Sequence, residues 1–158
     1  SNLCLLMLGN GSQAGFIRKL FMQAGVSEQV HFPGQVSGSD LPRYYRAADL
    51  YVSASHSDGS SISLLEAMAS GCPVLVSDIP GNREWVKPGV QGWWFKDGDR
   101  NDLEQSLCRV MDEERDKLPE MGRAARMLAE SRADWKKNFP ELFRAYSLAF
   151  QSPRNHRH

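Results

Sequence analysis

Residues 55–78 read SHSDGSSISLLEAMASGCPVLVSD, and this stretch decides the fold. Small polar residues precede apolar residues at helical spacing, which are Ile62, Leu65, Met68 and Ala69. Gly71 and Pro73 end this helix, because glycine accepts the left-handed conformation and proline cannot continue a helix. Residues 73–78 then form a compact apolar run, which is typical of a buried strand. The stretch therefore predicts a loop, a helix and a strand.

The same alternation continues on both sides of this stretch. Further strands are predicted at residues 4–9, 29–32, 49–55 and 92–95, with helices at 16–24, 41–48 and 82–87, and only helices from residue 101 onward. Strands separated by single helices run parallel, with right-handed crossovers. The predicted fold class is therefore α/β, a doubly wound parallel sheet of Rossmann-like type with a helical C-terminus.

Composition excludes several classes of protein. A length of 158 residues is usual for one domain, and 41% hydrophobic with 24% charged residues is ordinary for a globular chain. Lys plus Arg and Asp plus Glu both number 19, so no overall charge favours a nucleic-acid partner. The cysteines, Cys4, Cys72 and Cys108, show no metal or disulfide spacing and are interpreted as buried thiols in a reducing compartment. The run LCLLML at 3–8 is too short for a membrane span, and a cytoplasmic protein is expected.

Ligands of doubly wound sheets bind beyond the carboxyl ends of the strands. Three loops qualify, and they are Gly9-Asn10-Gly11, Gly34-Gln35-Val36 and Ser55 to Ser61. The third loop opens a helix, whose free N–H groups can bind a phosphate. Glu66 would lie about one turn inside that helix, and Asp58 would lie just ahead of it. Two carboxylates beside a phosphate site fit a nucleotide-sugar, since carboxylates accept hydrogen bonds from vicinal hydroxyls.

These residues resemble the signature of the retaining, nucleotide-sugar-dependent glycosyltransferases of GT-B fold. That signature is Glu, seven residues, Glu, and an Ala-Met-Ala-Gly-type helix end, and here it reads DGSSISLLEAMASGCPVLVSD. The similarity extends through GNGS, VHFPGQVSGSDLPRYYRAADLYVSAS, IPGNREWVKPGVQGWWFKDGD and the terminal helices. It implies that residues 1–150 are a C-terminal donor-binding domain, incomplete at its N-terminus, with a disordered tail at 151–158.

The resemblance also implies roles for individual residues. Glu66 would hold the ribose hydroxyls, and Asp58 would reach the hydroxyls of the donor sugar. The segment Gly59, Ser60, Ser61 and Ile62 would offer backbone N–H groups to the diphosphate or the sugar. The turn Gly34, Gln35 and Val36 would take the base through main-chain contacts, and the loop Gly9, Asn10 and Gly11 would lie near the phosphates. The family is similar in using no metal ion and no cofactor, because cationic side chains and helix N-termini stabilise the departing diphosphate.

Three departures from the family pattern bear on this expectation. The first family Glu is Asp58, one methylene shorter, and the usual Phe-Gly pair is replaced by Ser60-Ser61. The Arg and Lys that clamp the phosphates in the family precede the segment matched by residue 3, as does the acceptor-binding domain. We therefore expect no turnover by this chain alone, an N-terminal acceptor domain as its partner, and membrane-surface association only through that absent half.

Simpler interpretations stay open for the same residues. Ser63-x-x-Glu66 is also a capping box, and Asp58 beside Gly59 is a frequent turn pair. The glycines at 9 and 11 are explained equally by a tight turn. A non-catalytic nucleotide-sugar-binding module and a nucleotide-sugar epimerase are the alternative functions. A dehydrogenase is disfavoured, because the glycine pattern of GNGSQA ends early and no acidic residue closes the second strand about 20 residues later as a ribose ligand.

The last predicted helix carries more aromatic residues than a surface helix needs, and these are Trp135, Phe139, Phe143 and Tyr146. In the family this element crosses back toward the partner domain. The stripe either packs on the sheet edge or is exposed, in which case it would drive self-association. Pro140 is expected to break or kink the helix near Asn138.

Overall fold

The computed structural model of the protein describes residues 3–151. Its internal contacts divide the chain into two units, one up to Arg43 and one from Tyr44 onward. The boundary falls inside the short helix α2 (Leu41–Ala47), which the sequence pattern predicts at 41–48.

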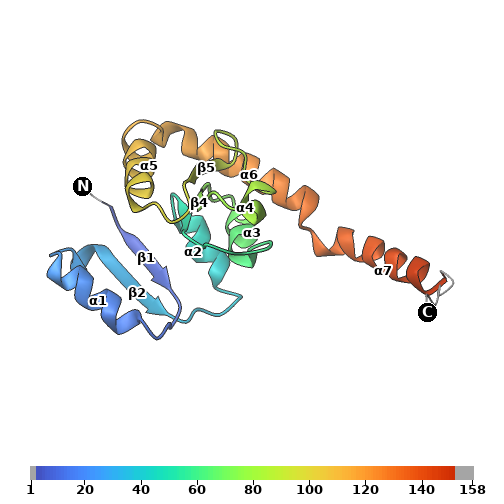
Figure 1. The fold of residues 1–158 in the computed structure, drawn as a ribbon, viewed down its shortest axis with the longest axis horizontal. Coiled ribbons are helices and arrows are strands. Elements are labelled where there is room, and N and C mark those ends of the chain that lie inside the picture. The colour runs from blue at the N-terminus through green and yellow to red at the C-terminus, as the bar shows by residue number, and fades with distance from the viewer. Residues whose placement is uncertain (1–2, 152–158) are drawn as a thin grey trace, which may run out of the picture. The chain divides into compact units, whose positions relative to one another are not determined.

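The first unit is a β-α-β arrangement. It contains β1 (Leu5–Leu8), α1 (Ala14–Gln23), the single turn η1 (Ser27–Gln29) and β2 (Val30–Gly34) (Figure 1). The two strands pair in parallel, with Leu5 opposite Val30. None of the residues of α1 is buried. A ring contact between Phe21 and Phe32 at 6.1 Å joins the helix to β2. Strand pairing and a few surface contacts therefore hold this unit together.

The second unit is built on a parallel sheet of three strands in the order β3-β4-β5. The strands are β3 (Tyr51–Ser53), β4 (Val74–Ser77) and β5 (Gly92–Phe95). Their register places Tyr51 opposite Val74, and Val74 opposite Gly92. The helices of this unit are α3 (Ile62–Ala69), α4 (Pro80–Arg83), α5 (Arg100–Asp112), the turn η2 (Arg115–Lys117), α6 (Leu118–Arg132) and α7 (Trp135–Gln151).

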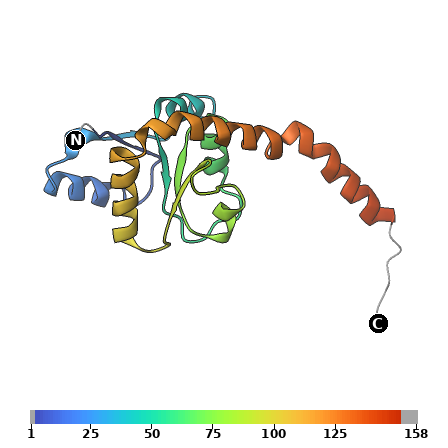
Figure 2. The ribbon, with the colours of Figure 1, turned by 90° about the horizontal axis from the view of Figure 1, so that it is seen from above.

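The central strand β4 is buried along its whole length and separates two hydrophobic cores. Val74 and Val76 pack with α3 and α6 on one face, where Leu64 and Met68 are fully buried. Leu75 points to the other face and packs with residues of β5, α5 and the start of α6. Figure 2 shows α3 and α5 on opposite sides of the three strands. Helices on both faces of a parallel sheet confirm the predicted fold class.

Three details differ from the sequence prediction. The five strands form two parallel sheets, of two and three strands, rather than one. Helix α4 begins at Pro80 rather than near residue 82, because proline suits the first turn of a helix. Of the cysteines, Cys72 is buried, whereas Cys4 and Cys108 are exposed.

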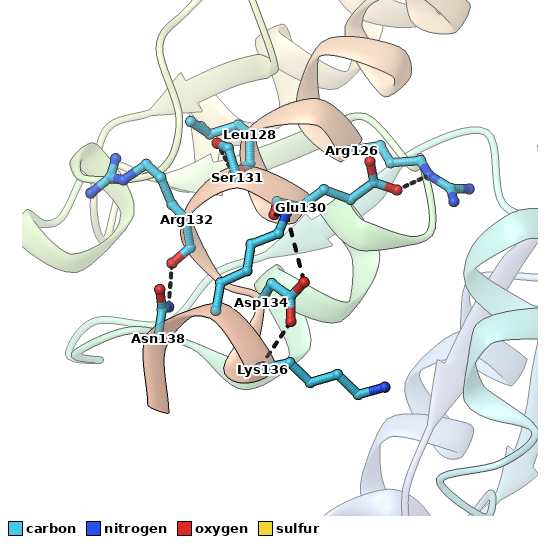
Figure 3. A network of polar contacts seen from close by, with 9 residues as sticks. Arg126, Leu128, Glu130, Ser131, Arg132, Asp134, Lys136 and Asn138 are labelled. Carbon is cyan, nitrogen blue, oxygen red and sulfur yellow. Dashed lines mark hydrogen bonds and ion pairs between the residues drawn. The ribbon is translucent and has the colours of Figure 1, made fainter. Parts of the chain in front are cut away.

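Helices α6 and α7 meet at a polar junction. Glu130 accepts a hydrogen bond from Arg126 at 2.7 Å, and Asn138 donates to the carbonyl oxygen of Arg132 at 2.7 Å (Figure 3). Asp134 caps the start of α7 by accepting from the backbone N–H of Lys136 at 2.9 Å. These hydrogen bonds satisfy some of the backbone groups that the two helix ends leave free.

Helix α7 is continuous through Pro140, so the predicted break does not occur. Its aromatic residues are exposed, with Trp135 at 63% and Phe143 at 66%, so of the two alternatives for this stripe the exposed one is confirmed. The described part of α7 reaches Gln151, so the first residue of the tail predicted at 151–158 is helical, and residues 152–158 lie outside the described part of the chain. Among residues 3–151, no helix has the length and apolar character needed to cross a membrane.

Candidate functional site

The two glycine loops of the first unit lie side by side. The backbone N–H of Gly9 donates to the carbonyl oxygen of Gly34 at 2.8 Å, which extends the pairing of β1 and β2 beyond the strands. Gly34 has a φ of +81°, a conformation that favours glycine. A Cβ there would lie 3.4 Å from Oδ1 of Asn10. The structure therefore brings the loop at 9–11 and the turn at 34–36 together at the carboxyl ends of their strands.

The loop that follows β3 in the second unit ends at the start of α3. Asp58, Gly59 and Ser60 are exposed on it, and Ser61 is the buried N-cap residue. Ile62, the first residue of the helix, is 74% exposed. The Ser61 side chain makes no capping hydrogen bond, so it leaves the first N–H groups of α3 open to a ligand. The predicted geometry of this loop and helix start is confirmed.

The start of α4 fixes the loop from one side. A Cβ added to Gly81 would overlap the carbonyl oxygens of Asp58 and Gly59, so the two backbones touch. Nε1 of Trp85 donates to Oγ of Ser60 at 3.3 Å. This side of the loop is therefore shaped by contacts that need a glycine and a tryptophan at fixed places.

The end of β4 fixes the beginning of the same loop. The buried Ser77 donates from Oγ to the carbonyl oxygen of Ser55 at 2.5 Å. Asn82, also buried, donates to the carbonyl oxygen of Ser77 at 2.8 Å. Buried polar groups that satisfy one another in this way hold a backbone in one position.

Two exposed polar contacts, one of them an ion pair, lie at the same end of the sheet. Nδ1 of His56 is 2.7 Å from Oδ1 of Asp97, which joins the loop after β3 to the loop after β5. Asp78 pairs with Arg83, and the hydrogen bond from Arg83 lowers the pKa of the Asp78 carboxyl. Exposed pairs of this kind contribute little to stability.

Glu66 lies on α3 and is half-buried. The hydroxyl of Tyr45 donates to its Oε2 at 3.2 Å. The capping-box interpretation is not realised, because the N-cap of α3 is Ser61 rather than Ser63. Oγ of Ser63 instead lies 2.8 Å from the hydroxyl of Tyr51. Burial raises the pKa of Tyr45, and the negative charge of Glu66 raises it further, so this phenol stays protonated and donates at neutral pH.

The predicted site residues therefore form two groups, one in each unit. Asp58 and Glu66 flank one helix start, and within residues 3–151 the Asp58 side chain makes no hydrogen bond or ion pair. Sequence reasoning missed the supporting residues Tyr45, Tyr51, Ser77, Gly81, Asn82 and Trp85. Of these residues, only Tyr45 could have been picked out from the sequence, because it belongs to the apolar stripe of the helix predicted at 41–48. In the described part of the chain, no group of three or more His, Cys, Asp or Glu residues is arranged to hold a metal ion.

The chain matches one known protein family over most of its length. The family model of the glycosyl transferases group 1 matches residues 1–139. The D-inositol 3-phosphate glycosyltransferase of Nocardia farcinica is 32% identical over 151 residues, which covers 92% of this chain and 33% of that protein. The chain thus spans about a third of the length of this curated relative.

Solved structures share the fold. The sucrose-phosphate synthase of Thermosynechococcus elongatus superposes with a TM-score of 0.84 at 25% identity, over 92% of this chain and 38% of that chain. HepE of Anabaena, solved in complex with UDP-glucose, superposes with a TM-score of 0.81 at 23% identity, over 91% of this chain and 40% of that chain. The likeness to HepE concerns the fold alone.

Proposed function

The chain belongs to the glycosyl transferases group 1 family, and from this premise we propose that it binds the nucleotide-diphosphate sugar donor of a glycosyltransferase. The sugar would then pass to an acceptor held by a second domain. By the family resemblance, the transfer would retain the anomeric configuration and would need no metal ion or cofactor. We also propose that the chain is part of a longer glycosyltransferase, which transfers the sugar to an acceptor and is located in the cytoplasm.

One observation carries the proposal. Glu66 and Asp58 lie on either side of a helix start whose first N–H groups have no side-chain cap. N–H groups at a helix start attract a diphosphate, and carboxylates accept hydrogen bonds from sugar hydroxyls. The loop is held by Ser77, Gly81 and Trp85, so these groups are in place before a ligand arrives.

The glycine loops of the first unit are proposed to bind the base through main-chain contacts. The loop at 9–11 and the turn at 34–36 expose backbone groups beside each other, joined by the Gly9–Gly34 hydrogen bond. Backbone N–H and C=O groups can pair with the edge of a base without any particular side chain. HepE was solved with UDP-glucose, so UDP-sugars are the first donors to test, followed by GDP- and ADP-sugars.

Calorimetric titration of the chain with UDP-, GDP- and ADP-glucose, and with the three free diphosphates, tests the proposal. Glu66→Ala should weaken the diphosphate and its sugar alike, by about 1–3 kcal/mol, because a charged hydrogen-bond acceptor is lost. Asp58→Ala should weaken the nucleotide-sugar more than the free diphosphate, since Asp58 would contact only the sugar.

Two results would count against these roles. If Glu66→Ala lowered thermal stability and left every affinity unchanged, Glu66 would be a structural residue. Equal losses for nucleotide-sugar and free diphosphate in Asp58→Ala would remove the sugar contact from the proposal. Glu104→Ala on the exposed face of α5 serves as the control for a carboxylate outside the site.

A further inference from the structure

Tyr45 is a buried residue of α2 whose hydroxyl reaches a carboxylate of the candidate site. Its side chain is 9% exposed, and the hydroxyl donates to Oε2 of Glu66 at 3.2 Å. The two residues are 21 positions apart in the chain, so the contact joins α2 to α3.

The ring of Tyr45 is fixed by a second tyrosine. Tyr51, on β3, meets it in an edge-to-face arrangement with ring centroids 6.1 Å apart. The hydroxyl of Tyr51 is 2.8 Å from Oγ of Ser63, one turn before Glu66 on α3. The two tyrosines therefore hold the first turns of α3 at two successive points, and neither can rotate without losing the contact with the other.

The hydrogen bond from Tyr45 occupies one oxygen of the Glu66 carboxylate and leaves the other open. An ionised carboxylate has two oxygens and about four acceptor positions, so it can accept from a phenol and from a ligand hydroxyl together. Because burial and the charge of Glu66 raise the pKa of Tyr45, the phenol remains a donor across the neutral range. The carboxylate is thereby held in one orientation before any ligand binds.

We propose that Tyr45 is a positioning residue. By orienting the Glu66 carboxylate toward the ribose hydroxyls, it gives the site its preference for ribose over deoxyribose. This inference rests on the proposed function, in which Glu66 accepts from those hydroxyls. A carboxylate that is oriented in advance loses less side-chain freedom when it accepts a second hydrogen bond. Without the phenol, Glu66 still carries its charge but samples several rotamers.

The test compares ribose with 2′-deoxyribose diphosphates. UDP, GDP and ADP are each paired with the 2′-deoxy analogue, and the affinity ratio of each pair is measured by calorimetry for the parent chain, Tyr45→Phe, Glu66→Ala and Tyr44→Phe. Phenylalanine keeps the ring that packs on Tyr51 and removes only the hydroxyl. Tyr44 is the neighbouring tyrosine on α2, and within residues 3–151 its hydroxyl makes no hydrogen bond, so its variant is the matched control.

Tyr45→Phe should reduce the preference for ribose about three- to tenfold, as expected for one hydrogen bond to a charged group. The affinity for the deoxy analogue should fall less than that for the ribose compound, because the analogue keeps only the 3′-hydroxyl for Glu66 to accept from, and Tyr44→Phe should change neither value. A purely structural role for Tyr45 would instead lower both affinities equally along with the melting temperature, and this result would overturn the inference.

Glu66→Ala separates a failure of this inference from a failure of the proposed function. If Glu66→Ala abolishes the ribose preference and Tyr45→Phe leaves it intact, the positioning role is wrong and the proposed function stands. If Glu66→Ala itself leaves the preference unchanged, or no diphosphate binds the parent chain, the proposed function fails and the inference fails with it.

Discussion

The loop and helix start at 55–66 and the glycine loops at 9–11 and 34–36 are the two predicted ligand-binding regions, one in each unit, and they are held in different ways. Side chains from α2, β4 and the turn after α4 fix the first region, through Tyr45, Ser77 and Trp85. A single backbone hydrogen bond between Gly9 and Gly34 joins the two loops of the second. Recognition of hydroxyls by a carboxylate needs an oriented side chain, whereas recognition through the main chain needs only the register of two strands.

The first region also rests on more tightly packed side chains than the second. Helix α3 places Leu64 and Met68 in a core where both are fully buried. Helix α1, next to the glycine loops, buries none of its residues. The first region is therefore expected to open only when its unit unfolds, and the second to open locally at a lower free energy.

Leu64→Ala gives the largest expected effect and tests the contrast in packing directly. Removing a fully buried leucine side chain should lower the free energy of unfolding by about 2–5 kcal/mol. Leu20→Ala on α1, where the leucine is 46% exposed, should cost about 1 kcal/mol or less. Chemical denaturation followed by circular dichroism measures both. Equal losses would show that α1 is packed as tightly as α3.

Gly81→Ala tests the contact between α4 and the loop at 55–61. Because the added Cβ would overlap the carbonyl oxygens of Asp58 and Gly59, the loop must move, at a cost of about 1–3 kcal/mol. Gly15→Ala is the matched control in the other unit, since a Cβ on α1 meets nothing within 4 Å. That variant should gain about 0.5–1 kcal/mol from helix propensity. Hydrogen exchange of the loop amides should rise in Gly81→Ala only, and unchanged exchange there would argue against the contact.

Asp78→Asn should have the smallest effect, visible as a change in acid sensitivity. The folded-state pKa of Asp78 is lowered by Arg83, so the stability from this pair is present at neutral pH and is lost as the pH falls through the lowered pKa. Thermal melting followed from about pH 7 to about pH 3 should show a shallower decrease for Asp78→Asn than for the parent chain. Asp112→Asn, at the exposed end of α5, should leave the decrease unchanged. A parallel decrease for Asp78→Asn and the parent would exclude a contribution from the pair.

Periodicity predicted the strands and helices because each apolar stripe is local in the sequence. The buried run VLVS and the alternation that places Trp93 and Phe95 in one core both follow from two-residue strand periodicity. The separation into two sheets could not be predicted, since it depends on how separate segments pack. The exposure of α7 could not be predicted either, because a helix with the same aromatic stripe can be covered by another element or exposed.

Only those parts of the candidate site that depend on local sequence spacing could be predicted. Asp58 and Glu66 were found because their spacing around a helix start is visible in the sequence. Their supports were missed, because Tyr45, Ser77 and Trp85 are distant in sequence and reach the loop only through the fold. A buried serine and a helix tyrosine look like ordinary core residues until their hydrogen-bond partners are known.

We propose that a nucleotide-sugar binds at the start of α3, where Asp58 and Glu66 lie. An NMR titration of the isotopically labelled chain with UDP-, GDP- and ADP-glucose, with NAD as a control, tests it most directly. The account predicts shifts at residues 34–36 and 58–66, strongest for one nucleotide and absent with NAD. A folded chain that shows no shift at these residues with any of the three sugars would contradict it.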